Sequence, residues 1–242
     1  MASTPTPFVI LTGAGISADS RVPTFRGRDG FWNTYRVEEL ATPQAFNNDP
    51  DLVWSFYHWR RERIRSCQPN PAHETVAAIQ QTHSAITIIT QNVDGLHQAA
   101  GSVNTLELHG SLWRMRCCIC GNRWEDRKSR TSIPSYPFCG GRARPDVVWF
   151  GETLDATLLQ AAVEASISAA CMLIIGTSGL VYPAASLPGE AQRAGATLIE
   201  FNREETTLTP GVDIHIAGRA AETLPRWWAQ QRQHQSVSLD EG

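Results

Sequence analysis

The 242-residue sequence predicts an α/β fold: a doubly wound parallel sheet with a small inserted cysteine-bearing domain and a helical module. Short apolar segments alternate along the chain with amphipathic ones, which is typical of a parallel sheet covered by helices on both faces. Hydrophobic residues make up 42% of the chain and charged residues 19%, a composition typical of a globular protein with a large core. Most of the cysteines fall in one segment with little apolar periodicity, which indicates a separate small domain.

Short apolar runs that end at a glycine or a polar residue predict strands. They are residues 8–12, 85–90, 105–109, 146–150, 171–177, 196–202 and 213–217. Apolar residues that recur at three- and four-residue spacings predict helices. These are residues 51–65, 73–82, 156–170 and 221–232, with a further helix that ends within 190–195. We expect residues 23–30 to form a loop and the polar tail from residue 233 onward to fray.

Polar residues and glycines follow several of the predicted strands. They are Gly13, Gln91, His109, Gly176 and Asn202. The carboxyl ends of parallel strands meet at one edge of a sheet, and open α/β sheets bind ligands at that edge. We therefore expect these residues to converge on one crevice.

Gly13, Ala14 and Gly15 open the segment that follows the first predicted strand. Glycines at such a position let the backbone approach a phosphate, and a helix N-terminus offers free N–H groups. The pattern lacks the third glycine of G-x-G-x-x-G. A plain tight turn explains it equally well.

Residues 90–97, TQNVDGLH, place Asn92 and Asp94 at a strand end. Buried polar side chains cost stability unless they meet a partner such as a ligand, although both residues could instead cap the next helix. His109 also ends a strand, and histidine titrates near neutral pH, so it is a candidate general base. A structural histidine is the commoner alternative, and it is our interpretation of His97.

Cys117, Cys120 and Cys139 resemble zinc ligands in their spacing. A four-cysteine site has two Cys-x2-Cys pairs, and Tyr136 occupies the position where the second pair needs its first cysteine. Two interpretations stay open. One is a three-cysteine zinc site with an incomplete fourth position, and the other is a metal-free lobe held by packing.

Tyr57 and Arg60 lie three residues apart in a predicted helix, so they share one face. A hydroxyl and a guanidinium together can bind a carboxylate. The spacing alone favours a partly buried tyrosine beside a solvated arginine.

The net charge of −3 argues against DNA binding. No apolar run approaches the ~20 residues that span a bilayer, and residues 1–8 lack the features of a secretory signal. We therefore expect a cytoplasmic protein, with an organellar or nuclear location as alternatives. The sequence leaves the oligomeric state open.

A series of motifs in a specific order resembles the sirtuin family over nearly the whole chain. The motifs are GAGISADSRVPTFRG, TQNVDGLH, LHGS, the cysteine module, RPDVVWFGE, GTSGLVYPAA and EFN. The resemblance implies a Rossmann-like NAD-binding domain, a helical insert and a small zinc-ribbon-like domain. Their expected ranges are 1–34, 86–112 and 145–242 for the first, 35–85 for the second and 113–144 for the third.

The resemblance also implies an NAD-dependent protein lysine deacylase, whose partners are acylated lysine side chains of proteins. The PTFR sequence at 23–26 and the pair Tyr57 and Arg60 resemble the class III branch, in which tyrosine and arginine bind the carboxylate of succinyl-, malonyl- or glutaryl-lysine. This makes a binding role the favoured interpretation of Tyr57 and Arg60. The expected products are nicotinamide, O-acyl-ADP-ribose and free lysine. A deacetylase or a mono-ADP-ribosyltransferase on the same scaffold is the alternative.

The resemblance assigns a role to each matching residue. The catalytic residues would be the general base His109 together with Asn92 and Asp94. The NAD-binding residues would be Gly13, Ala14, Gly15, Phe25, Arg26, Gln91, Asn92, Asp94, Gly176, Thr177, Ser178, Asn202 and Glu204. The substrate-binding residues would be Tyr57, Arg60, Val148, Trp149 and Phe150. The zinc ligands would be Cys117, Cys120 and Cys139, with Tyr136 in place of the expected fourth cysteine.

Two further positions depart from the family pattern. Arg21 stands where the family usually has glycine, which predicts a changed loop backbone. Val37 stands where class III members often have a smaller residue beside the acyl pocket, which predicts a tighter pocket.

Overall fold

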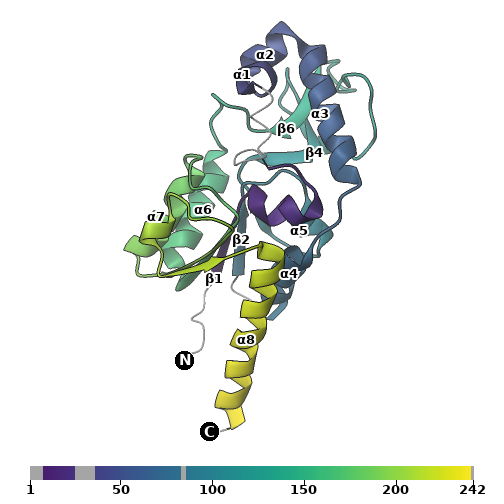
Figure 1. Ribbon diagram of the computed structural model, residues 1–242. Coiled ribbons are helices and arrows are strands. Elements are labelled where there is room, and N and C mark those ends of the chain that lie inside the picture. Colours follow the sequence, from purple (N-terminus) through teal and green to yellow (C-terminus); the bar gives the residue numbers. More distant parts are fainter. Residues whose placement is uncertain (1–7, 25–35, 83–85, 241–242) are drawn as a thin grey trace.

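The fold is seen in a computed structural model that describes residues 8–24, 36–82 and 86–240. These residues form a six-stranded sheet, a three-stranded sheet and a helical module beside the smaller sheet (Figure 1). Phe25 and Arg26, which the resemblance assigns to NAD binding, lie outside the described residues, as does the side chain of Val37. Among the described residues, no helix has both the length and the apolar character that crossing a bilayer requires.

The large sheet contains six of the predicted strands, and all neighbouring pairs are parallel. They are β1 (Phe8–Thr12), β2 (Ile86–Thr90), β3 (Thr105–Glu107), β7 (Cys171–Ile175), β8 (Thr197–Asn202) and β9 (Ile214–Ala217). Their order is β3-β2-β1-β7-β8-β9, so the direction of strand addition reverses between β1 and β7. The predicted doubly wound, Rossmann-like sheet is confirmed.

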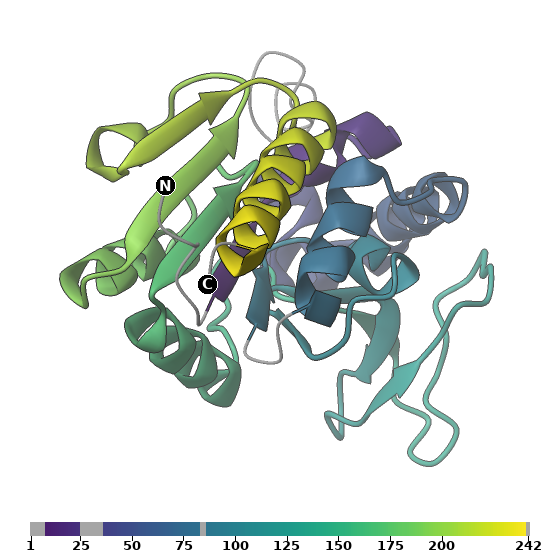
Figure 2. The same ribbon diagram turned by 90° about the horizontal axis from the view of Figure 1, so that it is seen from below.

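Helices cover both faces of this sheet (Figures 1 and 2). On one face α4 (Pro71–Thr82) lies beside α8 (Ala220–Asp240), and the two pack on β1 and its neighbours. On the other face α6 (Ala156–Ser168) and α7 (Leu187–Arg193) pack together. The expectation that the tail frays from residue 233 is wrong, because α8 continues to Asp240. Gln233 and Gln235 have good helix propensity even without an apolar pattern.

The small sheet is antiparallel and has the order β5-β4-β6. It consists of β4 (Gly110–Cys117), β5 (Arg123–Glu125) and β6 (Ala143–Val147). The prediction of a parallel-sheet strand over 146–150 is wrong, because the strand pairs with β4 and ends at Val147. Its Asp146 carboxylate pairs with Arg114 of β4 at 3.4 Å and with Arg123 of β5 at 3.2 Å, so the charged partners of this residue lie on the strands of the small sheet. Strands β4 and β6 run through the positions 112/113 and 144/145 that bounded the expected cysteine-bearing domain.

The helical module consists of α1 (Val37–Leu40), α2 (Pro43–Asn48) and α3 (Pro50–Arg65). Thr42 and Asp49 cap α2 and α3, because their side-chain oxygens accept hydrogen bonds from the N–H groups of Ala45 at 3.1 Å and Leu52 at 2.9 Å. Buried Arg61 of α3 donates to the carbonyl oxygens of Asp126 at 2.5 Å and Lys128 at 3.0 Å. These bonds hold α3 against the cysteine-bearing lobe.

Candidate active site

A cleft of about 930 Å³ runs along the carboxyl edge of the large sheet. Its lining includes every strand-end residue that the sequence pointed to: Gly13, Gln91, His109, Gly176 and Asn202. The prediction of one crevice is therefore confirmed. The cleft includes the loops after β1 and β7, where the strand order reverses, and this is where doubly wound sheets bind ligands.

The glycines after β1 let two loops of the chain pack closely. A Cβ atom on Gly13 or Gly15 would lie 2.8 Å or 2.6 Å from the backbone of Gly176. Their N–H groups donate to the carbonyl oxygens of Ile175 at 3.0 Å and Gly176 at 2.8 Å. The segment that follows, η1 (Ala14–Ser20), is a 3-10 helix of seven residues, so the macrodipole of a long helix is not available here. The main role of these glycines is therefore to let the two loops pack closely, and phosphate binding is not needed to explain them.

Asn92 lines the cleft, whereas Asp94 is buried beside it. The Asn92 amide nitrogen donates to the Gly13 carbonyl at 3.0 Å and to the Ser17 hydroxyl at 3.2 Å, so its oxygen is the atom that can serve a ligand. Asp94 accepts from the Ser17 hydroxyl at 2.7 Å and from the Leu96 N–H at 2.9 Å. Burial raises the pKa of Asp94. Asp94 thus contacts the first N–H group of α5 (Leu96–Ala99), although the N-cap residue is Gly95 and has no side-chain cap, so neither Asn92 nor Asp94 is the N-cap that the alternative predicted.

The hydrogen bonding of His109 leaves one of its ring nitrogens able to accept a proton. Its Nδ1 lies 2.9 Å from the Gln91 carbonyl oxygen, which can only accept, so Nδ1 carries the proton and Nε2 keeps its lone pair. Burial lowers the pKa of His109, so the imidazole is neutral at pH 7. By contrast, His97 is 1% exposed and its Nε2 lies 2.9 Å from the Thr12 hydroxyl. Its contacts agree with a structural interpretation.

Val148, Trp149 and Phe150 line the cleft just beyond β6. The Val148 N–H donates to the His109 carbonyl oxygen at 2.9 Å, and the Phe150 N–H donates to the Ala41 carbonyl oxygen at 2.9 Å. This segment thus connects the backbone of the candidate base with the helical module.

Tyr57 and Arg60 line the same cleft from α3. The Tyr57 hydroxyl accepts a hydrogen bond from Trp149 Nε1 at 2.8 Å, and burial raises the pKa of Tyr57, so the hydroxyl keeps its proton. The Arg60 guanidinium lies 5.6 Å from the centre of the Tyr57 ring. Arg60 is half-buried, unlike the solvated arginine of the alternative interpretation. The cleft therefore contains a neutral hydroxyl and a cation side by side.

Thr177, Ser178 and Glu204 line the cleft as well. The Gln91 amide donates to the Thr177 hydroxyl at 2.9 Å, and the Asn202 amide donates to the Thr177 carbonyl oxygen at 2.9 Å. These bonds connect the loops that follow β2, β7 and β8.

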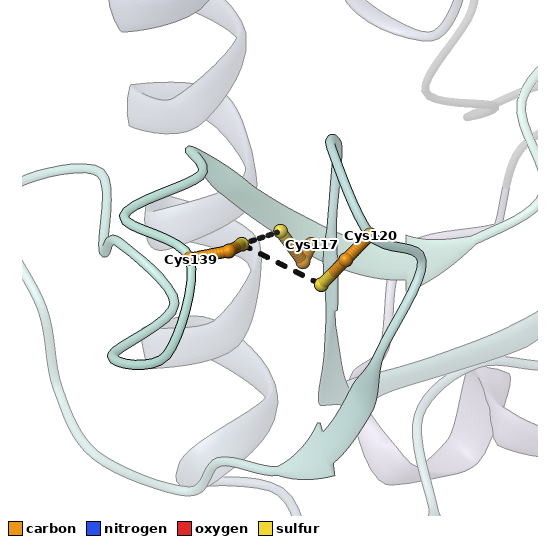
Figure 3. Close-up of side chains that lie close together, drawn as sticks. All are labelled: Cys117, Cys120 and Cys139. Atoms are coloured by element: carbon orange, nitrogen blue, oxygen red, sulfur yellow. Dashed lines mark hydrogen bonds between the residues drawn. The ribbon is translucent and has the colours of Figure 1, made fainter.

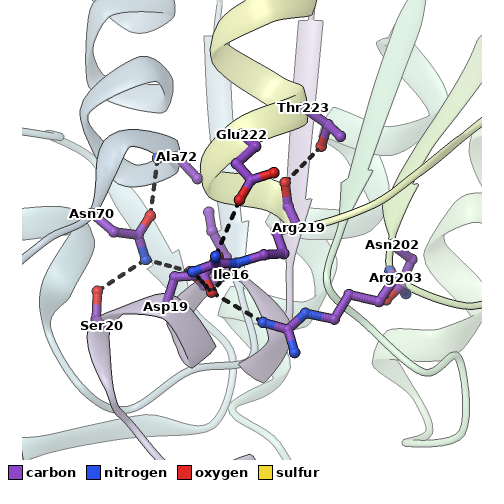
Figure 4. A network of polar contacts seen from close by, with 10 residues as sticks. All are labelled: Ile16, Asp19, Ser20, Asn70, Ala72, Asn202, Arg203, Arg219, Glu222 and Thr223. Atoms are coloured by element: carbon purple, nitrogen blue, oxygen red, sulfur yellow. Dashed lines mark hydrogen bonds and ion pairs between the residues drawn. The ribbon is translucent and has the colours of Figure 1, made fainter.

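A polar network centred on Asp19 was not predicted (Figure 4). Arg203, which lines the cleft, and Arg219 both pair with the Asp19 carboxylate, at 3.0 Å and 2.8 Å. The network connects η1 with the loop after β8 and with the residue that precedes α8. These partners are 184 and 200 residues apart, so no local sequence signal could have joined them.

Residues 13–183 match the sequence profile of the Sir2 family. The chain belongs to the Sir2 family. It is 51% identical over 219 residues to NAD-dependent protein deacylase 2 of Pyrobaculum aerophilum, covering 90% of this chain and 88% of that protein. It is 49% identical over 222 residues to the NAD-dependent protein deacylase of Aquifex aeolicus, covering 90% and 92%. A solved complex of a Sir2 homologue with NAD superposes with a TM-score of 0.88 and 45% identity, covering 94% of this chain and 90% of that one.

In this Sir2-family chain the three predicted zinc ligands are brought together (Figure 3). The sulfur atoms of Cys117, Cys120 and Cys139 all lie within 4.8 Å of one another. Thiolates around one tetrahedral zinc are separated by about 3.8 Å, since each Zn–S bond is about 2.3 Å. The three cysteines therefore fit three ligand positions. The Tyr136 hydroxyl accepts instead from the Asn122 amide at 3.0 Å.

The cleft of this Sir2-family chain also fits a dinucleotide. Its volume of about 930 Å³ is near the upper end for cofactor sites. Amide and carboxylate groups of Gln91, Asn92, Asn202 and Glu204 line it, and such groups suit ribose hydroxyls and a base. The lining thus provides the donors and acceptors that NAD requires.

Proposed function

We propose that this Sir2-family enzyme, an NAD-dependent protein deacylase, prefers acyl groups that end in a carboxylate, namely succinyl, malonyl and glutaryl groups on lysine. One observation carries the preference: Tyr57 and Arg60 line the same cleft as His109. Their hydroxyl and guanidinium match the two oxygens and the charge of a carboxylate. An acetyl group has no carboxylate, so it would gain nothing from the hydroxyl and the guanidinium at this point.

The loops after β1, β2, β7 and β8 would hold NAD. Gln91, Asn92, Thr177 and Asn202 would orient its ribose groups, and Glu204 would accept from a hydroxyl or an amine. When bound, NAD supplies a ribose carbon that takes the acyl oxygen as nicotinamide leaves. The products would be nicotinamide, O-acyl-ADP-ribose and free lysine.

His109 would act as the general base through Nε2. The Gln91 carbonyl fixes the tautomer, and burial keeps the imidazole neutral at pH 7. A neutral imidazole can take a proton from a ribose hydroxyl and so make that oxygen nucleophilic.

Val148, Trp149 and Phe150 would form the wall of the acyl-lysine channel. Their side chains are apolar or aromatic and limit the access of water to the reacting atoms. The hydrogen bond from the Val148 N–H to the His109 carbonyl keeps this wall beside the base.

We also propose that Cys117, Cys120 and Cys139 bind a structural zinc ion with three thiolates. Tyr136 does not supply the fourth ligand in this arrangement, because its hydroxyl is bonded to Asn122. The proposed ion would stabilise a lobe that buries little apolar surface.

The test is a paired assay on one peptide that carries either succinyl- or acetyl-lysine, with NAD and with mass spectrometry as the readout. We expect a kcat/KM at least tenfold higher for the succinyl peptide. Arg60→Met should reduce desuccinylation about 30- to 150-fold more than deacetylation, which corresponds to about 2–3 kcal/mol for a desolvated charge pair.

Each other result has a distinct meaning. A wild-type preference for the acetyl peptide would contradict the carboxylate preference and leave a deacetylase. Labelling of protein by ADP-ribose without release of lysine would indicate a transferase. Equal losses on both peptides in Arg60→Met would assign Arg60 a structural role.

A further inference from the structure

The contact between Trp149 and Tyr57 fixes the direction of a hydrogen bond. Trp149 Nε1 lies 2.8 Å from the Tyr57 hydroxyl oxygen. An indole nitrogen can only donate, so the tyrosine oxygen is the acceptor. Within the described ranges of the chain, no acceptor lies within hydrogen-bond distance of this hydroxyl. The tyrosine proton is therefore available to a ligand in the cleft.

Trp149 is itself held in place by an ion pair. One carboxylate oxygen of Glu152 accepts from the Trp149 backbone N–H at 2.8 Å, and the other accepts from Arg144 at 2.6 Å. The Arg144 guanidinium lies 3.7 Å from the centre of the Trp149 ring. The side chains of Arg144 and Glu152 are 5% and 20% exposed. With contacts at its backbone and on its ring face, the indole has little freedom to rotate.

Arg144 also adds positive charge near the hydroxyl. Burial dominates the pKa of Tyr57 and raises it, while the charges of Arg60 and Arg144 act in the opposite direction. Arg144 Nη1 is buried and has no hydrogen-bond partner among the residues that the structure describes. A buried cation with an unpaired nitrogen costs stability, and this cost at a position beside the Tyr57 and Trp149 side chains points to a use beyond packing.

We propose that Trp149, clamped by Arg144 and Glu152, is the positioning residue that makes the pocket selective for acyl groups with a terminal carboxylate. It presents the Tyr57 hydroxyl as a donor to one carboxylate oxygen, while Arg60 pairs with the other. An acetyl group ends in a methyl group, which accepts no hydrogen bond, and gains nothing from this arrangement. The inference rests on the proposed carboxylate preference and names the residue that sets it.

The test compares Trp149→Phe with wild type on the succinyl and acetyl peptides. Phenylalanine keeps an aromatic ring but removes the donor. We expect the succinyl-to-acetyl ratio of kcat/KM to fall about tenfold, mainly through a higher KM for the succinyl peptide. Because Trp149 acts through the tyrosine hydroxyl, adding Trp149→Phe to Tyr57→Phe should not lower the ratio further.

Two more variants separate positioning from packing. Phe46→Leu changes the other aromatic contact of Trp149, at 5.3 Å between ring centres, without removing a hydrogen bond. It should leave the ratio within twofold of wild type. Glu152→Gln keeps the size of the side chain at this position but weakens its pairing with Arg144. It should therefore lower the succinyl-to-acetyl ratio of kcat/KM about threefold. It also serves as the test if Trp149→Phe does not fold.

The outcomes separate the two proposals. If wild type prefers the succinyl peptide but Trp149→Phe keeps that preference, the positioning role is wrong and the proposed function stands. Equal losses on both peptides, or a further fall of the ratio in the double variant, would also overturn the positioning role. A wild type without a succinyl preference would overturn both.

Discussion

At the residue scale, one hydrogen-bond partner separates the two histidines near the carboxyl edge of the sheet. His97 Nε2 is used by the buried Thr12 hydroxyl. His109 uses Nδ1 for a backbone carbonyl, which leaves Nε2 for chemistry. Both lie after strands of the large sheet, so residue type and position in the chain could not assign their roles.

The substitution His109→Ala should abolish deacylation while NAD still binds, because the base is lost and the cleft remains. In wild type, burial lowers the pKa of His109 from its ordinary 6.5. The acid limb of kcat/KM should therefore have its midpoint below pH 6.5, since the base stays unprotonated down to that pH. A pH–rate profile checks this, with calorimetric NAD binding as the control. A midpoint above pH 7, or substantial activity in the variant, would contradict the assignment.

Arg21 has a φ of 64°, in the left-handed region that favours glycine. Arg21 thus has the backbone conformation that a glycine would favour at this position, and this does not support the expectation of a changed loop backbone. Arg21→Gly should raise the free energy of unfolding by about 0.5–1 kcal/mol, because relief of backbone strain exceeds the entropy that glycine adds to the unfolded chain. Urea denaturation measures it. Arg21→Ala, which keeps a Cβ atom, should give no gain, and an equal gain in both variants would contradict the argument.

At the element scale, the sequence predicted the strands of the large sheet because they are continuous apolar runs. The strand at Ala143–Val147 was misplaced because most of its residues are not apolar, whereas the residues directly after it are. Helices α1 and α2 were not predicted, since elements of four and six residues carry too few turns for a periodic pattern. The cysteine spacing was the exception, because it predicted three residues whose sulfur atoms do lie within 4.8 Å of one another.

Zinc binding by the cysteine lobe should respond to single substitutions. Cys139→Ser should remove most of the zinc and lower the melting temperature, because it deletes one of three thiolates. Tyr136→Cys should tighten zinc binding about tenfold or more by completing two Cys-x2-Cys pairs. Elemental analysis and competition with a chromogenic chelator measure both effects. An unchanged melting curve in Cys139→Ser, with no zinc in wild type, would support a metal-free lobe.

At the scale of the whole molecule, the site is assembled from distant segments. Strand ends were predictable, because topology brings them to one edge whatever the details of packing. The Tyr57–Trp149 bond and the Asp19 network were not, since they join residues 92, 184 and 200 positions apart. Such contacts depend on how elements far apart in the chain pack together, which no local pattern encodes.

His73 and His97 are buried in neutral form, which makes the stability of the fold depend on pH. Burial lowers the pKa of His73 to about 3 and that of His97 to about 4. The unfolded chain binds protons at these residues near pH 6.5, so the stabilisation is complete above pH 6.5 and is lost as pH falls toward 4. In this pH window, each histidine should make the free energy of unfolding fall by about 1.4 kcal/mol for each pH unit of acidification.

Urea denaturation between pH 7 and pH 4.5 measures this slope. In His97→Gln one titrating group is absent, so the slope should be smaller than in wild type by about 1.4 kcal/mol per pH unit. The comparison of slopes is independent of any constant loss of stability in the variant. Identical slopes would show that His97 is not buried in its neutral form.

Strand β4 begins at Gly110, the residue directly after His109. A Cβ atom on Gly110 would lie 1.9 Å from the Asp146 carbonyl oxygen, and the returning chain bonds to the His109 carbonyl through Val148. The chain therefore passes from the large sheet to the small one, and returns, beside His109. If the small sheet rotated against the large one, the axis of rotation would lie near these two connections. Residues close to a rotation axis move least. Opening or closing the cleft would change its width at α3 while His109 keeps its distance from the loops that follow β1 and β2.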